Sequence, residues 1–229
     1  MFDKESTKVK SMFSSIASSY DLTNHIISFG MHNLWKRKLV SLAPEDNDIK
    51  ALDLCTGTGD LLPLLGRKYS DVTGADFCPS MLKIARDKFS DEYNLIEADA
   101  LDLPFEDNSY DLITIAYGIR NFENLDRGLK EVSRVLKNGG TLLILESGQP
   151  DNFIISKFFN FYSKHILPLI GLIFAKNKSA YTYLPETASS FPYGKDLNTI
   201  LEKNEFIPEK ARSLSFGVSY IYKSKLKIA

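Results

Sequence analysis

The hydrophobic positions follow a helical period at the N-terminus and then alternate between short runs and amphipathic segments. Residues 7–42 are expected to be helical, since Val9, Phe13 and Ile16 recur at helical spacing. From residue 49 onward, short apolar runs predict strands, and the amphipathic segments between them predict helices. The predicted strands are 49–55, 71–76, 93–99, 110–118 and 141–147, and the predicted helices are 61–68, 79–89, 125–137 and 194–206.

Strands that alternate with helices predict an α/β fold with a doubly wound, mostly parallel sheet. Residues 210–225 predict an antiparallel strand pair, which brings this sheet to seven strands. Ser80 is expected to cap the helix 79–89, and Asn138–Gly140 to end the helix 125–137. We therefore expect one domain, made of a helical cover (7–42), a sheet core (49–147), a helical insertion (151–195) and a closing helix and strand pair (194–224).

Composition excludes several classes of protein. A net charge of −1 provides no global basic field for nucleic acid. Cys55 and Cys78 are the only cysteines, and the N-terminal residues are charged, so we expect a cytoplasmic protein without a disulfide framework or a secretory signal. The three histidines show no ligand spacing with these cysteines, and no metal site is predicted. The longest apolar run, 166–175, is too short to span a bilayer.

The most informative local motif is DLCTGTGD, residues 53–60, at a predicted strand–turn–helix junction. Gly57 and Gly59 permit a tight turn and a close approach of the backbone to a ligand. The following helix directs its N-terminus at that ligand. A dinucleotide fingerprint needs a third glycine where this chain has Leu62, which disfavours a nicotinamide cofactor.

Three acidic residues at strand ends favour S-adenosyl-L-methionine as the cofactor of the core 49–147 instead. Asp53 is placed to meet the methionyl ammonium, and Asp76 to accept hydrogen bonds from both ribose hydroxyls. Asp99, followed by Ala100, is placed to accept from the adenine amino group. Each aspartate alone would be read as a helix cap or a solvated turn, but three at successive strand ends behind GTG form a specific combination.

The chain resembles the ubiquinone and menaquinone biosynthesis C-methyltransferases over nearly its whole length. The resemblance rests on the N-terminal block 12–40, on DLCTGTGDLL (53–62), on ITIAYGIRNF (113–122) and on YTYLPETASSFP (181–192). It implies a Rossmann-like class I methyltransferase that methylates a ring carbon of a polyprenyl quinol. The acceptor is demethylmenaquinol or the benzoquinol of the ubiquinone pathway, and the resemblance does not choose between them.

The resemblance also carries roles onto individual residues. Thr58, Asp76, Asp99 and Ala100 match cofactor contacts of the family, and Ala116 stands where the family often has a serine. Tyr20 belongs to the N-terminal motif and is expected to contact the cofactor beside the reacting atoms.

Arg120 and Asn121, just past the fourth predicted strand, are the candidate catalytic residues. A ring carbon becomes nucleophilic when an adjacent hydroxyl ionises, and the charged guanidinium of Arg120 suits the resulting oxygen. Asn121 is expected to orient the ring or a water molecule. The alternative for Arg120 is an ion pair with a carboxylate that only fixes the loop. The candidate bases are Tyr20, Asp21, His25, Asp60 and Tyr181, and the sequence does not choose among them.

Other readings remain open. The acceptor could be another small apolar molecule, or the chain could be a non-catalytic cofactor-binding partner protein. An adenine-directed nucleic-acid methyltransferase is disfavoured because AYGIRN (116–121) lacks the proline motif that holds a flipped base. The aromatic segment 153–175 is expected to form a substrate lid, or to make peripheral contact with the inner face of the cell membrane. The chain could act as a monomer or as a homodimer.

Overall fold

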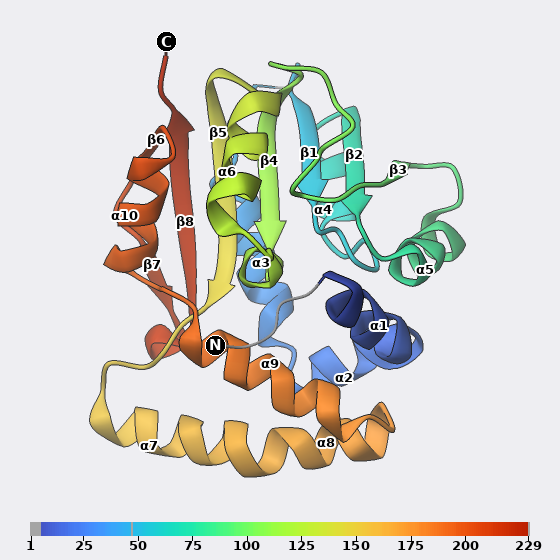
Figure 1. Cartoon of the computed structure of the whole chain (residues 1–229), viewed down its shortest axis with the longest axis vertical. Helices are drawn as coiled ribbons and strands as arrows, with labels where there is room; N and C mark the ends of the chain where they lie inside the picture. The colour runs from blue at the N-terminus through green and yellow to red at the C-terminus, as the bar shows by residue number, and fades with distance from the viewer. Residues whose placement is uncertain (1–5, 47, 229) are drawn as a thin grey trace.

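A single sheet organises the protein, which a computed structural model describes over residues 6–46 and 48–228. The strand order is β3-β2-β1-β4-β5-β8-β6, with β7 also paired to β8 (Figure 1). The strands are β1 (Lys50–Leu54), β2 (Asp71–Asp76), β3 (Asn94–Glu97), β4 (Tyr110–Ala116), β5 (Leu136–Ser147), β6 (Phe206–Pro208), β7 (Arg212–Leu214) and β8 (Ser219–Leu226).

The first five strands are parallel, and β8 runs antiparallel to β5. The short strands β6 and β7 pair with opposite ends of β8, so they divide one strand position between them. The sheet therefore has the seven positions that the sequence predicts, and the doubly wound α/β class is confirmed.

Helices cover both faces of the sheet. In β4, Leu112 packs with Leu39 of α3 on one face, whereas the next residue, Ile113, packs with Leu129 of α6 on the other. This alternation follows from the two-residue period of a strand that is buried on both sides. The helices are α1 (Ser6–Ile16), α2 (Tyr20–Ile27), α3 (Met31–Val40), α4 (Leu62–Gly66), α5 (Pro79–Phe89), α6 (Leu125–Val135), α7 (Phe153–Phe161), α8 (Leu167–Phe174), α9 (Lys178–Ser190) and α10 (Lys195–Lys203).

Helices α1 and α2 and the helical insertion lie together beyond the carboxyl ends of the parallel strands (Figure 1). A separate apolar cluster joins them, in which Phe13 and Ile16 of α1 pack with Met81 of α5 and Tyr181 of α9. Helices α7 and α8 continue into each other through the π-helical turn η3 (Tyr162–Ile166). No helix in residues 6–46 and 48–228 is long and apolar enough to cross a membrane.

Two local predictions are wrong. Helix α6 ends at Val135, and Asn138–Gly140 lie inside β5 rather than in a helix cap. Leu136 is fully buried and pairs with Tyr110, and the pairing shifts register between Tyr110 and Leu112. Extension of the sheet therefore prevails over the residues that predicted a helix cap. Ser80 does not cap α5.

Proline determines where α5 begins. Pro79 takes the first turn, where its missing N–H is not needed, and the capping position falls on Cys78. The Cys78 amide donates to Asp76 Oδ1 at 2.8 Å. The Ser80 hydroxyl instead donates to Ser14 of α1 at 3.2 Å, so it links the cover to α5.

Candidate active site

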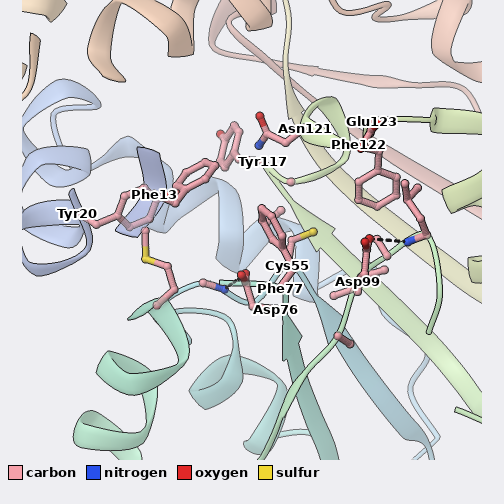
Figure 2. Close-up of a pocket in the computed structure, with 18 residues that line it drawn as sticks. Phe13, Tyr20, Cys55, Asp76, Phe77, Asp99, Tyr117, Asn121, Phe122 and Glu123 are labelled. Carbon is pink, nitrogen blue, oxygen red and sulfur yellow. Dashed lines mark hydrogen bonds between the residues drawn. The ribbon is translucent and has the colours of Figure 1, made fainter. Parts of the chain in front are cut away.

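Two adjoining cavities lie at the carboxyl ends of the parallel strands. The first has a volume of about 760 Å³, and Figure 2 shows the residues that line it. The second has a volume of about 1230 Å³ and extends from the glycine loop to the helical insertion. The residues that line both cavities are Tyr20, Cys55, Gly57, Ala116 and Tyr117.

The two glycines of the loop serve different purposes. Gly57 has φ +57°, and a Cβ atom added there would meet nothing within 4 Å, so this backbone borders open space. Gly59 has φ +84°, and its added Cβ would lie 2.7 Å from the Phe89 ring. Gly57 thus lines the cavities as expected, whereas Gly59 lines neither and allows close packing against α5.

Asp76 and Asp99 both line the first cavity, together with Ala100. Asp76 accepts from the Gly57 amide at 2.9 Å, and burial raises the pKa of its carboxyl to about 6. Asp99 accepts from the Leu101 amide at 2.9 Å. Two carboxylates oriented by backbone amides beside the glycine loop suit the hydroxyl and amino donors of an adenosine.

Aromatic and aliphatic walls complete the first cavity. Phe77, Met81 and Phe122 provide apolar surface for a flat ring. Asn121 Oδ1 is buried and, within residues 6–46 and 48–228, has no hydrogen-bond partner, so a ligand donor would satisfy it. The donor set and the walls therefore fit S-adenosylmethionine.

Asp53 lies at the second cavity rather than the first. Its carboxylate is fully buried and accepts from the hydroxyls of Thr56 and Thr114, each at 2.7 Å. Burial raises the pKa of Asp53 to about 6, although both hydrogen bonds oppose that shift. Thr58 lines the same cavity and donates to Asp21 Oδ1 at 2.5 Å. Contact of Asp53 with a methionyl ammonium stays a prediction.

Arg120 lines the second cavity from the turn η2 (Ile119–Asn121), just after β4. Its Nη1 donates to Glu146 Oε1 at the end of β5, at 2.5 Å, and both side chains are buried. Its Nε is also buried and has no partner in the described part of the chain. The structure thus contains the ion pair that sequence reasoning held as the alternative, and it also places the guanidinium at the cavity.

Asn121 lies apart from Arg120: it lines the first cavity and not the second. The reason is the tight helical turn after β4, in which successive side chains point about 120° apart and Arg120 and Asn121 diverge. A role for Asn121 in orienting the acceptor ring or a water molecule stays a prediction. Tyr20 lines both cavities, and burial raises the pKa of its hydroxyl to about 12, so it stays protonated at neutral pH.

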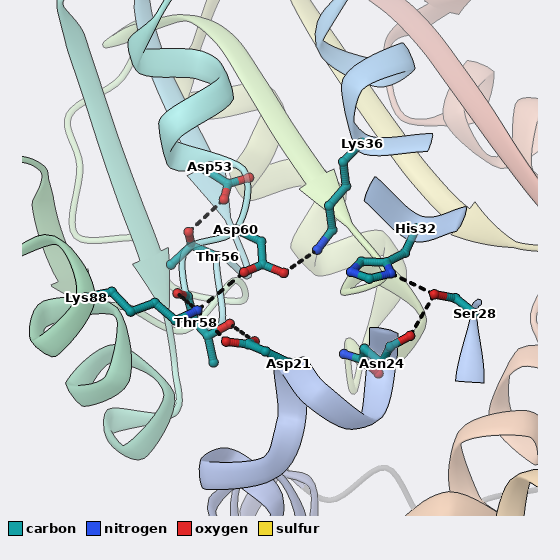
Figure 3. Close-up of polar contacts among 10 residues, drawn as sticks. All are labelled: Asp21, Asn24, Ser28, His32, Lys36, Asp53, Thr56, Thr58, Asp60 and Lys88. Carbon is teal, nitrogen blue, oxygen red and sulfur yellow. Dashed lines mark hydrogen bonds and ion pairs between the residues drawn. The ribbon is translucent and has the colours of Figure 1, made fainter. Parts of the chain in front are cut away.

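Of the other candidate bases, Asp21, His25 and Tyr181 line neither cavity. Asp60 lines the second, where it belongs to a network of charges (Figure 3). Lys36 donates to Asp60 Oδ2 at 2.8 Å, and Lys88 donates to Asp60 Oδ1 at 3.4 Å and pairs with Asp21. Burial favours a higher pKa for Asp60, but the two ammonium groups outweigh it and lower that pKa. The network ties α2, α3 and α5 to the glycine loop.

Sequence reasoning missed two functional candidates, Glu146 and His32. Glu146 follows an apolar strand, which is the same signal that identified the three aspartates. His32 lies in the N-terminal block and lines the second cavity. The helical spacing of hydrophobic residues in that block does not indicate that His32 borders a cavity. No cluster of three or more potential metal ligands occurs within residues 6–46 and 48–228.

Comparisons with known proteins identify the family of the chain. The model of the ubiE/COQ5 methyltransferase family matches residues 1–225. A demethylmenaquinone methyltransferase of Bacteroides fragilis is 38% identical over 226 residues, covering 96% of this chain and 92% of that protein. One of Staphylococcus aureus is 37% identical over 229 residues, covering 97% of this chain and 95% of that protein. A solved S-adenosylmethionine-dependent methyltransferase of Thermotoga maritima has a TM-score of 0.69 at 17% identity, covering 95% of this chain and 99% of that chain.

Proposed function

Because the chain belongs to the ubiE/COQ5 methyltransferase family, we propose that it methylates a ring carbon of a polyprenyl quinol, with demethylmenaquinol as the acceptor. The protein is a methyltransferase that uses S-adenosylmethionine. The observation that supports this acceptor best is the second cavity, which combines the buried guanidinium of Arg120 with apolar walls and adjoins the first.

The cofactor is assigned to residues of both cavities. Asp76, Asp99 and Ala100 would hold its adenosine in the first cavity, and Gly57 and Thr58 would border its methionyl part. S-adenosylmethionine supplies an electrophilic methyl group on a sulfonium. The residues common to both cavities mark where that group and an acceptor ring would meet.

Arg120 provides the charge that the acceptor needs. A ring hydroxyl held against a guanidinium in a water-poor cavity has a lowered pKa, and its ionised oxygen is stabilised there. Glu146 fixes the orientation of the guanidinium by accepting from Nη1. Arg120 Nε, which has no hydrogen-bond partner among the described residues, is available as a donor. The loss of one such donor typically reduces turnover by about 10²–10³-fold.

The helical insertion provides the apolar wall of the second cavity. Phe159, Tyr162, Leu167 and Leu184 line it from α7, η3, α8 and α9. These side chains suit an aromatic bicycle or the first units of a prenyl tail. A compact polar acceptor would leave this surface without a partner.

The outer side of α7 and α8 supports peripheral contact with a membrane. Lys157 and Lys164 are exposed among the apolar side chains, as suits an anionic inner leaflet. The opposite side of the same helices lines the second cavity, so a lipid-dissolved tail has a short route into it. The exposed apolar residues of α7 and α8 are Phe153, Ile154, Phe158, Phe161, Leu169, Leu172, Ile173 and Phe174.

The test is methyl transfer from labelled S-adenosylmethionine to reduced demethylmenaquinol in detergent, with the benzoquinol precursor assayed in parallel. We expect turnover on demethylmenaquinol, and the ratio of the two rates identifies the pathway. Intact cofactor binding without turnover on either quinol would overturn the proposal. It would favour another small apolar acceptor or a non-catalytic partner protein.

A further inference from the structure

The proposed function requires a group that takes the proton of the ring hydroxyl, and most titratable side chains of the second cavity cannot do so. Burial keeps Tyr20, Tyr117 and Cys55 protonated by raising their pKa values. Both oxygens of Asp53 already accept hydrogen bonds from threonines. Asp60 is paired with two lysines that lower its pKa.

His32 is the remaining candidate base at this cavity. It lies on α3, lines the second cavity, and its Nδ1 is 2.7 Å from Ser28 Oγ. The Ser28 hydroxyl donates its single proton to the Asn24 carbonyl oxygen at 2.7 Å (Figure 3). Ser28 Oγ can therefore only accept from the imidazole, which places the imidazole proton on Nδ1 and leaves Nε2 as an acceptor.

Burial of His32 keeps the imidazole neutral. Burial is the largest cause that lowers its pKa, to about 4, and the ammonium of Lys36 adds to it. Asp60 and Asp21 oppose this shift, while the ring of His25, 5.9 Å away and edge-on, supports it. At neutral pH the imidazole is unprotonated and its Nε2 is ready to accept.

We propose that His32 is a catalytic residue whose Nε2 accepts the hydrogen bond of the acceptor's ring hydroxyl and takes its proton. The inference rests on the proposed quinol methylation. In the step, the O–H bond breaks, its electron pair stays on the oxygen, and an N–H bond forms, which gives a phenolate beside an imidazolium.

Arg120 and Asp60 make this transfer feasible for a weak base. Arg120 lines the same cavity and lowers the pKa of the hydroxyl, while Asp60 stabilises the imidazolium. Ser28 holds the ring through Nδ1 throughout. Positioned general bases of this kind contribute about 10²–10⁴-fold to a rate.

The first test is the substitution His32→Asn. The asparagine amide can replace Nδ1 as donor to Ser28 but has no group in place of Nε2. We expect kcat on demethylmenaquinol to fall at least 100-fold, with the melting temperature and the affinity for S-adenosylmethionine unchanged. His165→Asn is the matched control, since His165 is exposed on η3 and lines neither cavity, and it should keep the wild-type kcat.

Two kinetic outcomes would overturn the inference while the proposed function stands. One is a wild-type kcat in His32→Asn. The other is a loss of cofactor affinity that accounts for the loss of turnover, which would make His32 a cofactor contact. If the wild-type protein methylates no quinol, the proposed function fails first and this inference fails with it.

A second readout does not depend on turnover. Nitrogen NMR of the protein with ¹⁵N-labelled histidine reports which imidazole nitrogen carries the proton. We expect the neutral Nδ1–H form of His32 at pH 7, and a shift of the Nε2 signal when reduced demethylmenaquinol is added. An Nε2–H form, or an Nε2 signal that the quinol leaves unchanged, would contradict the proposal.

Discussion

Arg120 and Glu146 form a buried ion pair between the turn after β4 and the end of β5. The Nη1–Oε1 distance is 2.5 Å, and the side chains are 8% and 1% exposed. Glu146 Oε1 also accepts from the Ser147 amide at 2.7 Å. The pair fixes the guanidinium at the tip of the two central strands, beside the second cavity.

Removal of the carboxylate alone should destabilise the protein strongly. Glu146→Gln keeps the shape of the side chain but leaves Arg120 as a buried, uncompensated charge. Such a loss costs about 3–5 kcal/mol of the free energy of unfolding, measured by urea denaturation. Asp87→Asn, in the exposed pair of Lys83 and Asp87, is the control and should cost less than about 1 kcal/mol. Equal effects of the two substitutions would contradict a buried pair.

Removal of both charges should separate stability from catalysis. The double variant Arg120→Met and Glu146→Gln has no unpaired charge, and we expect it to recover most of the stability that Glu146→Gln loses. Turnover should not recover, because in the proposed reaction the guanidinium stabilises the ionised hydroxyl. Recovery of wild-type kcat on demethylmenaquinol would show that Arg120 serves only to hold the loop.

If Asp76 holds the cofactor as proposed, cofactor affinity should depend on pH. Its pKa of about 6 means that the carboxylate becomes protonated as the pH falls below 6, and a protonated group accepts fewer hydrogen bonds. We expect calorimetry to show weaker S-adenosylmethionine binding below pH 6. Asp76→Asn should weaken binding by about 10–100-fold, as loss of charged hydrogen bonds implies. Asp71→Asn, at the other end of β2, should bind as the wild type does.

The same carboxyl has the opposite effect on the stability of the ligand-free protein. Its folded pKa, about 6, lies above the ordinary carboxyl pKa of 3.8, so the folded state binds the extra proton between these values. The contribution of Asp76 to stability is therefore lost as the pH rises from about 4 to about 6. Asp53, whose pKa is also about 6, should add to this trend in urea denaturation of the ligand-free protein.

The sequence predicted the sheet well because its strands are buried on both faces. The run Leu112–Ala116 can only be a central strand, and its neighbours follow from the alternation with helices. The helix cap predicted at Asn138–Gly140 is wrong because helix caps and irregular strands use the same types of residue. Only the pairing of Leu136 with Tyr110, which is a tertiary contact, decides between them.

The site was partly predictable for a related reason. Asp76 is the last residue of β2 and Asp99 comes two residues after β3, so their place at the sheet edge follows from the order of elements. The division of Arg120 and Asn121 between two cavities depends on side-chain directions in one short turn, which no spacing encodes. His32 comes from a helix distant in sequence, and only packing brings it to the glycine loop.

Gly118 should tolerate no side chain while Cys55 is present. A Cβ atom at Gly118 would lie 2.4 Å from Cys55 Cβ and 2.7 Å from its Sγ. We expect Gly118→Ala to lower the free energy of unfolding by about 1–3 kcal/mol through overpacking. Cys55→Gly removes both contacts and suits the φ of +60° at that position, so the double variant should recover most of the loss. Additive effects in urea denaturation would contradict this contact.

The exposed face of α7 and α8 should bind anionic vesicles. Phe158 and Ile173 are 72% and 68% exposed, so their substitution by serine should leave the fold intact. Burial of each side chain in lipid is worth about 1.5–3 kcal/mol, and the double variant should therefore partition at least about tenfold less into phosphatidylglycerol vesicles. Ile207→Ser, at an exposed site on β6, is the matched control. Unchanged partitioning of the double variant would exclude this face as the membrane surface. If the wild type is a dimer and the double variant is a monomer in ultracentrifugation, the face binds a second copy of the chain.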